Sequence, residues 1–107
     1  KRYNRMEIIV GIDYGGRYEI LRAVNQAIKK GKTLDEKEFK EFLDTSGIID
    51  PDLIIRTGWE KRLSGYMPFQ STYSELIFLD VLFPDFTPQD LRDAIKEFED
   101  RKRKFGK

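Results

Sequence analysis

Apolar residues recur along the chain with two different periods, and together these predict an α/β protein. Short apolar runs at 6–14, at 52–58 and within 75–83 predict three buried strands. Apolar residues at helical spacing predict helices over the segments 16–31, 34–44, 68–76 and 87–106. The order strand, helix, helix, strand, helix, strand, helix favours a parallel sheet flanked by helices.

The predicted helices carry boundary signals and apolar faces. Gly31 ends the first helix, Thr33 and Glu36 form a candidate capping box for the second, and Thr87 precedes Pro88 at the start of the last. The residues predicted to face the core are Tyr18, Leu21, Val24, Ala27 and Ile28, then Leu34, Phe39, Phe42 and Leu43, then Phe69, Thr72, Tyr73 and Leu76, and finally Leu91, Ala94, Ile95 and Phe98.

The predicted sheet is narrow for an independent α/β domain. The chain has 107 residues, which is one domain or a piece of a larger one. The first predicted strand begins close to residue 1, and no earlier element covers one of its edges. We therefore expect that either a longer chain has been cut or a partner supplies the rest.

Composition restricts the chemistry that the chain can perform. It has no Cys and no His, so a general acid or base must be Asp, Glu, Lys, Tyr or solvent. A bound metal must be a hard cation held by oxygen, and Mg²⁺ fits best. The net charge is +1, which argues against bulk binding of polyanions. No apolar run is long enough to span a membrane, and we expect a cytoplasmic protein.

A basic, glycine-containing loop follows the second predicted strand, where parallel α/β sheets bind ligands. Within it, Arg56 and Arg62 offer paired donors to phosphate oxygens, and Ser64 adds a hydroxyl. The alternative is a loop whose arginines pair with acids such as Glu60 and Asp52. The local pattern slightly favours phosphate binding.

Acidic residues and the basic C-terminus have plain interpretations and functional ones. Glu75 alone is a solvated acid or a partner for Arg, but beside a diphosphate it becomes a candidate Mg²⁺ ligand. Asp13 and Asp80 are interpreted as ordinary strand-end acids. The segment "RKRKFGK" is a solvated helix end, or else an arm that reaches an anion or a neighbouring subunit. A nucleic-acid role would require a broader basic face.

Several spaced motifs resemble the C-terminal half of the cis-prenyltransferases, the undecaprenyl diphosphate synthase family. They are "DYGGR" at 13–17, "RTGWEKRLS" at 56–64, "YMPFQSTYSELIF" at 66–78 and "LFPDF" at 82–86, with a closing "RKRKFG". The similarity runs from about Met6 to Gly106. It implies that residues 1–107 are the C-terminal portion of a single cis-prenyltransferase domain, an incomplete part of that fold.

The resemblance also implies an activity and roles for individual residues. Members of the family add isopentenyl diphosphate to an allylic diphosphate with Mg²⁺, as homodimers or heterodimers, and make a polyprenyl diphosphate that is the precursor of a lipid carrier. By this resemblance the substrate-binding residues are Arg56, Arg62, Ser64 and Arg103, and the metal ligand is Glu75, serving the same or the partner subunit. Arg103 would cross the dimer interface, and the product would bring the protein to a membrane surface.

The chain departs from the family pattern at several positions. Trp59 replaces a glycine, Asp13 replaces an asparagine, and Pro68 and Phe69 replace an apolar residue and a tryptophan. The family's N-terminal half, which binds the allylic diphosphate, is not in this chain, so we expect no catalytic residue here and no elongation by this portion alone. The alternative function is a non-catalytic partner subunit of a heteromeric cis-prenyltransferase. A third is an unrelated anion-binding or nucleic-acid-binding domain.

Overall fold

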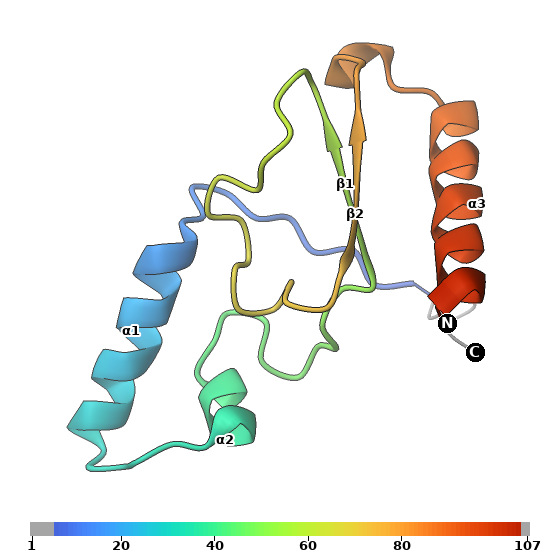
Figure 1. The fold of residues 1–107 in the computed structure, drawn as a ribbon. Coiled ribbons are helices and arrows are strands. Elements are labelled where there is room, and N and C mark those ends of the chain that lie inside the picture. Colours follow the sequence, from blue (N-terminus) through green and yellow to red (C-terminus); the bar gives the residue numbers. More distant parts are fainter. Residues whose placement is uncertain (1–5, 106–107) are drawn as a thin grey trace.

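The computed structural model describes residues 6–105, with side chains described as far as Lys102. Its elements are α1 (Gly16–Lys29), α2 (Glu36–Glu41), β1 (Leu53–Thr57), β2 (Glu75–Leu79), a 3₁₀ turn (Phe83–Asp85) and α3 (Pro88–Phe105). In Figure 1, α1 and α2 lie together on one side of the two strands, and α3 lies on the other side.

The sheet of the described residues consists of β1 and β2, which pair in parallel. Leu53 pairs with Glu75 and Arg56 pairs with Phe78, so the two strands begin and end together. The pairing continues past β1, where the Gly58 N–H donates to the Val81 carbonyl at 2.8 Å. The predicted α/β class and the parallel sheet with flanking helices are confirmed.

The prediction of a buried strand at 6–14 is wrong. Residues 6–12 form no strand, and the large apolar side chains among them are between 59% and 84% exposed. Figure 1 shows this segment as a coil that leads to the start of α1. A strand is defined by pairing with a neighbour, and within residues 6–105 no other strand hydrogen-bonds to this segment. The apolar pattern is therefore present without the partner that would turn it into a strand.

The first and last predicted helices are confirmed, although the buried face of α1 differs from the prediction. Tyr18, Leu21 and Ile28 are exposed, and the buried residues of α1 are Gly16, Glu19, Ala23 and Ala27. The buried face of the helix is therefore narrow and consists of small residues, with Glu19 as the one large side chain among them. Gly31 adopts φ +65°, which suits the predicted stop.

The two middle helices differ from the prediction. The capping box of α2 uses Asp35 and Glu38 instead of Thr33 and Glu36: the Glu38 N–H donates to Asp35 Oδ1 at 2.8 Å, and the Asp35 N–H donates to Glu38 Oε1 at 3.1 Å. A negatively charged carboxylate at the N-terminal end of a helix is stabilised by the helix dipole, whereas the neutral Thr hydroxyl gains much less from it. Residues 68–73 form successive turns in place of a helix, and Tyr73 is 91% exposed.

The core is small and divided between two places. The buried apolar residues of the described chain are Ala23, Ala27, Leu43, Ile77 and Ala94. The radius of gyration is 16.4 Å, whereas a compact domain of about 100 residues has one of about 13 Å. The chain is thus more open than a compact domain of its length.

No helix within residues 6–105 is long and apolar enough to cross a membrane.

Candidate functional site

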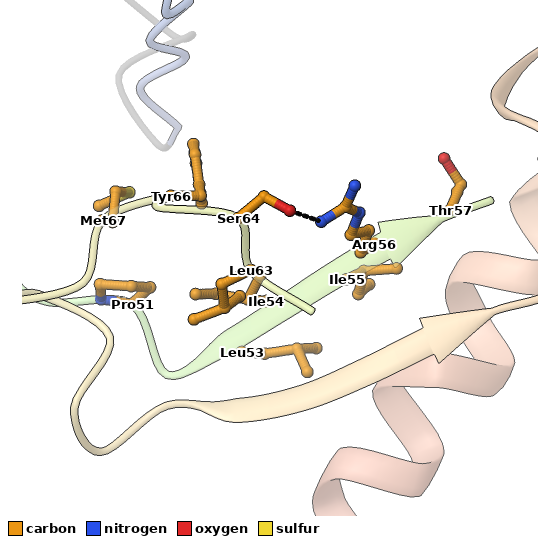
Figure 2. A pocket seen from close by; sticks show the side chains of 10 residues that line it. All are labelled: Pro51, Leu53, Ile54, Ile55, Arg56, Thr57, Leu63, Ser64, Tyr66 and Met67. Atoms are coloured by element: carbon orange, nitrogen blue, oxygen red, sulfur yellow. Dashed lines mark hydrogen bonds between the residues drawn. The ribbon is translucent and has the colours of Figure 1, made fainter. Parts of the chain in front are cut away.

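A cleft of about 540 Å³ lies along β1 and the loop that follows it. Figure 2 shows its lining, which is mostly apolar: Pro51, Leu53, Ile54, Ile55, Leu63, Tyr66 and Met67, with Arg56, Thr57 and Ser64. Polar groups therefore gather where β1 ends, and most of the other lining residues are apolar. Such a cleft suits a ligand that has an anionic head and an apolar tail.

Two of the predicted substrate-binding residues meet at this cleft. Arg56 Nη1 donates to Ser64 Oγ at 3.2 Å, the dashed contact in Figure 2. The same nitrogen donates to the Arg62 carbonyl oxygen, which holds the loop back over β1. Arg56 is half-buried, and the side chains of Arg62 and Ser64 are exposed. The strand thus fixes one guanidinium, and the loop brings the hydroxyl to it.

The Ser64 hydroxyl is presented by an unusual turn. Ser64 has φ +53°, Gly65 has φ +82° and Met67 has φ +47°. Non-glycine residues rarely adopt this left-handed region, and such strain is concentrated at binding sites. The Tyr66 N–H closes the turn by donating to the Leu63 carbonyl at 3.0 Å.

The alternative ion pairing is also present at this site. Glu60 Oε1 lies 2.7 Å from Arg56 Nη2, and Glu60 Oε2 lies 3.5 Å from Arg62 Nη1. One carboxylate therefore joins the two arginines, while Lys61 points to Asp80 at 3.3 Å. An anionic ligand would have to take over the donors that Glu60 now occupies. Since the Glu60 and Arg62 side chains are more than half exposed, this exchange costs little.

Glu75 is not among the residues that line the cleft, and it lies on the opposite face of the sheet from Arg56. In a strand successive side chains alternate between faces, and residues in register share a face. The register therefore puts Glu75 with Leu53 on one face, and Arg56 with Phe78 on the other. Glu75 Oε1 receives a contact from Arg101 Nη1 of α3 at 3.4 Å, so the structure does not bring Glu75 and Arg56 together.

The remaining predicted residues contribute less to the described site. Arg103 belongs to α3, but its side chain lies outside the described residues. Among the described residues no three Asp, Glu, His or Cys side chains gather as a metal centre. Glu75 is thus a single carboxylate, which fits Mg²⁺ only where phosphate oxygens complete the coordination. Trp59 is 64% exposed and does not line the cleft.

The sequence did not predict a buried polar network that is centred on Glu19. Glu19 is 1% exposed and accepts hydrogen bonds from the Tyr14 hydroxyl, from the Asp44 N–H at 2.8 Å and from Gln70 Nε2 at 3.2 Å. Gln70 Nε2 also donates to Thr45 Oγ1 at 3.1 Å. Burial and the hydrogen bond to Glu19 raise the pKa of the Tyr14 hydroxyl above its ordinary range. The available signal was the spacing of Glu19, Ala23 and Ala27, which puts the acid in a column of small residues.

Comparisons with known proteins place this geometry in a family. The sequence profile of the family described as "Putative undecaprenyl diphosphate synthase" matches residues 1–106. An isoprenyl transferase of Aquifex aeolicus is 45% identical over 100% of this chain and 47% of its own length. One of Thermotoga maritima is 45% identical over 99% of this chain and 48% of its own length.

A solved structure agrees with these sequence relatives. It is described as a probable undecaprenyl diphosphate synthase from Campylobacter jejuni. It matches with a TM-score of 0.75 and 41% identity, over 90% of this chain and 45% of that one. This chain therefore spans about half the length of the relatives that it matches. The family excludes the hypothesis of an unrelated anion-binding or nucleic-acid-binding domain. The chain belongs to the undecaprenyl diphosphate synthase family of isoprenyl transferases.

Proposed function

We propose that this chain carries the isopentenyl diphosphate half-site of a cis-prenyl chain-elongating transferase, as the C-terminal portion of its single domain. The observation that carries the proposal is the contact between Arg56 and Ser64 at the polar end of an otherwise apolar cleft. The guanidinium and hydroxyl donors suit a diphosphate, and the aliphatic lining suits a five-carbon alkene. Arg62 adds a second guanidinium once Glu60 gives way.

The chemistry of prenyl transfer agrees with these residues. The C–O bond of the allylic diphosphate breaks and releases diphosphate, and the alkene of isopentenyl diphosphate attacks the allylic cation to form a C–C bond. The tertiary cation that results loses a proton from the adjacent carbon, to the released diphosphate or to water, and this forms the new double bond. The arginines and Ser64 hold the diphosphate of isopentenyl diphosphate, so that its alkene is oriented toward the cation and water is kept from the cation. No His or Cys is needed. Mg²⁺, when bound, neutralises diphosphate charge, and Glu75 is the carboxylate that would help to hold it.

The same proposal includes the product and the partners. The product is a polyprenyl diphosphate, the precursor of a lipid carrier, and the second substrate is an allylic diphosphate. The protein acts as a homodimer or a heterodimer with a related subunit. Its cytoplasmic location, with contact to the membrane surface through the product, stays a prediction. This portion alone is expected to be inactive, because the allylic diphosphate site lies in the other half of the family's domain.

The first experiment is the intact mass of the natural protein, paired with an assay of incorporation. Radiolabelled isopentenyl diphosphate is supplied with farnesyl diphosphate and Mg²⁺. A mass roughly double 12.7 kDa with long-chain product supports the proposal. A mass near 12.7 kDa with no product, and with activity only after addition of a related subunit, would favour the non-catalytic partner instead.

A further inference from the structure

Residues 14–19 pack directly against the back of the turn that carries Ser64. The α-helix begins at Gly16, and a Cβ atom added there would lie 2.1 Å from the Gly65 carbonyl oxygen and 2.4 Å from Pro68 Cδ. Real Cβ atoms essentially never come within 3.0 Å of such atoms. The helix start and the turn are therefore in contact through backbone, and only glycine allows this approach.

Two further contacts join the same segments. The Tyr14 ring meets the Tyr66 ring edge-on, with centroids 5.7 Å apart. Glu19, one turn along α1, accepts from Gln70 Nε2 at 3.2 Å, and Gln70 is 2% exposed. The ring contact, the close approach of Gly16 and the buried hydrogen bond thus all join residues 14–19 to the segment 65–70.

We propose that Gly16 and Tyr14 are positioning residues for the isopentenyl diphosphate half-site, setting the place of Ser64 through the turn behind it. Neither residue lines the cleft. Because Ser64 precedes Gly65, a displacement of the Gly65 carbonyl also moves the hydroxyl relative to Arg56 Nη1. That hydroxyl is now 3.2 Å from the nitrogen, so a shift of about 1 Å breaks the arrangement. The inference rests on the proposed function, which names the ligand.

The chain offers a closely matched control for Gly16→Ala. Gly15 is adjacent and has φ −135°, which any residue adopts. A Cβ there would meet only Tyr18 Cβ, at an ordinary 3.8 Å. Gly15→Ala therefore makes the same chemical change at the same helix start without pressing on the turn. Tyr14→Leu is a second test variant: it removes the ring contact together with the hydroxyl that donates to Glu19, and it adds no volume.

The experiment uses the natural full-length protein and measures the Kd of each substrate separately by calorimetry. For Gly16→Ala the Kd of isopentenyl diphosphate is expected to rise about 10- to 100-fold, the range for losing a hydrogen bond to a charged group. For Tyr14→Leu the expected rise is about 2- to 10-fold. The Kd of the allylic diphosphate stays within 2-fold of wild type in both variants, as both values do in Gly15→Ala.

A second readout does not depend on any ligand. Hydrogen exchange at the amides of Tyr66 and Ser71, which donate to the Leu63 and Met67 carbonyls, is expected to quicken in Gly16→Ala and not in Gly15→Ala. Wild-type affinity and exchange in both Gly16→Ala and Tyr14→Leu would overturn the inference, as would an equal loss of affinity for both substrates. Failure of the proposed function looks different. Either wild type would not bind isopentenyl diphosphate, or Arg56→Ala would bind it as tightly as wild type does.

Discussion

Replacing Glu19 with leucine is expected to destabilise the protein strongly although the change is close to isosteric. The Glu19 carboxylate is 1% exposed and serves three donors, from Tyr14, Asp44 and Gln70. After Glu19→Leu, Gln70 Nε2 still has Thr45, but the Asp44 N–H loses the acceptor that it now has at 2.8 Å. The half-buried Tyr14 hydroxyl can turn toward water.

The expected size follows from these three losses. A typical hydrogen bond contributes about 1 kcal/mol net, and a buried donor left without a partner costs about 1–3 kcal/mol. With Tyr14 discounted for its access to water, the free energy of unfolding should fall by about 2–4 kcal/mol. Urea unfolding of the full-length protein, followed by circular dichroism, measures this change.

The control lies on the same helix. Gln26 is exposed on α1, and Gln26→Leu makes a polar-to-apolar change of similar size outside the network. Its effect should stay within about 0.5 kcal/mol. If Glu19→Leu were as mild as Gln26→Leu, the buried network would not hold α1 to the segment at 70, and the argument for its structural role would fail.

Three further predictions concern the cleft, alkaline pH and the dimer. Arg56→Ala should raise the Kd of isopentenyl diphosphate about 10- to 100-fold, whereas Lys61→Ala, which removes a loop cation that points to Asp80, should leave it unchanged; equal losses in calorimetry would indicate bulk charge only. Because the folded-state pKa of Tyr14 is raised, its contribution to stability is complete below about pH 10 and is lost as pH rises beyond that value. The fall in unfolding free energy above pH 10 should therefore be shallower in Tyr14→Phe, and parallel curves would contradict this. Finally, homodimers of Arg56→Ala and of Glu75→Gln should each have little activity. If one site draws on both subunits, half of the dimers in a random mixture are mixed and each has one intact site, so about a quarter of the wild-type activity should return. No recovery would put both residues in one subunit's site.

The sequence predicted the elements whose stability is local or comes from one neighbour. β1 and β2 were found because each is an apolar run bounded by turn residues, and they pair with one another. α3 was found because its apolar residues recur at helical spacing and Thr87 precedes Pro88 as a candidate cap. In the structure Thr87 does cap the helix, reciprocally with Asp90: the Asp90 N–H donates to Thr87 Oγ1 at 3.1 Å, and the Thr87 N–H donates to Asp90 Oδ2 at 3.0 Å. Such signals lie within a few residues of the structure that they specify.

The errors arose where distant partners decide the outcome. The segment 6–14 has the composition of a strand but no strand beside it within the described chain. The apolar stripe of α1 predicts burial, yet the helix buries Glu19 and its column of small residues because Gly16 must approach the turn at 65–68. Of the site residues, Arg56 and Ser64 came together as the pattern suggested, but a carboxylate, Glu60, stands between Arg56 and Arg62.

The two faces of the sheet limit which predicted residues can act on one ligand. Arg56 lines the cleft, whereas Glu75 is on the opposite face from Arg56, does not line the cleft, and contacts Arg101 of α3. A metal bound to Glu75 would have to reach around the sheet to touch a diphosphate held by Arg56 of the same chain. A second copy that presents its α3 face to the cleft has no such obstacle, and the same α3 carries Arg103 toward its C-terminal end. Whether Glu75 serves the diphosphate of its own subunit or of the partner is what the mixture of Arg56→Ala and Glu75→Gln subunits decides, and recovery of activity would make the dimer part of the site itself.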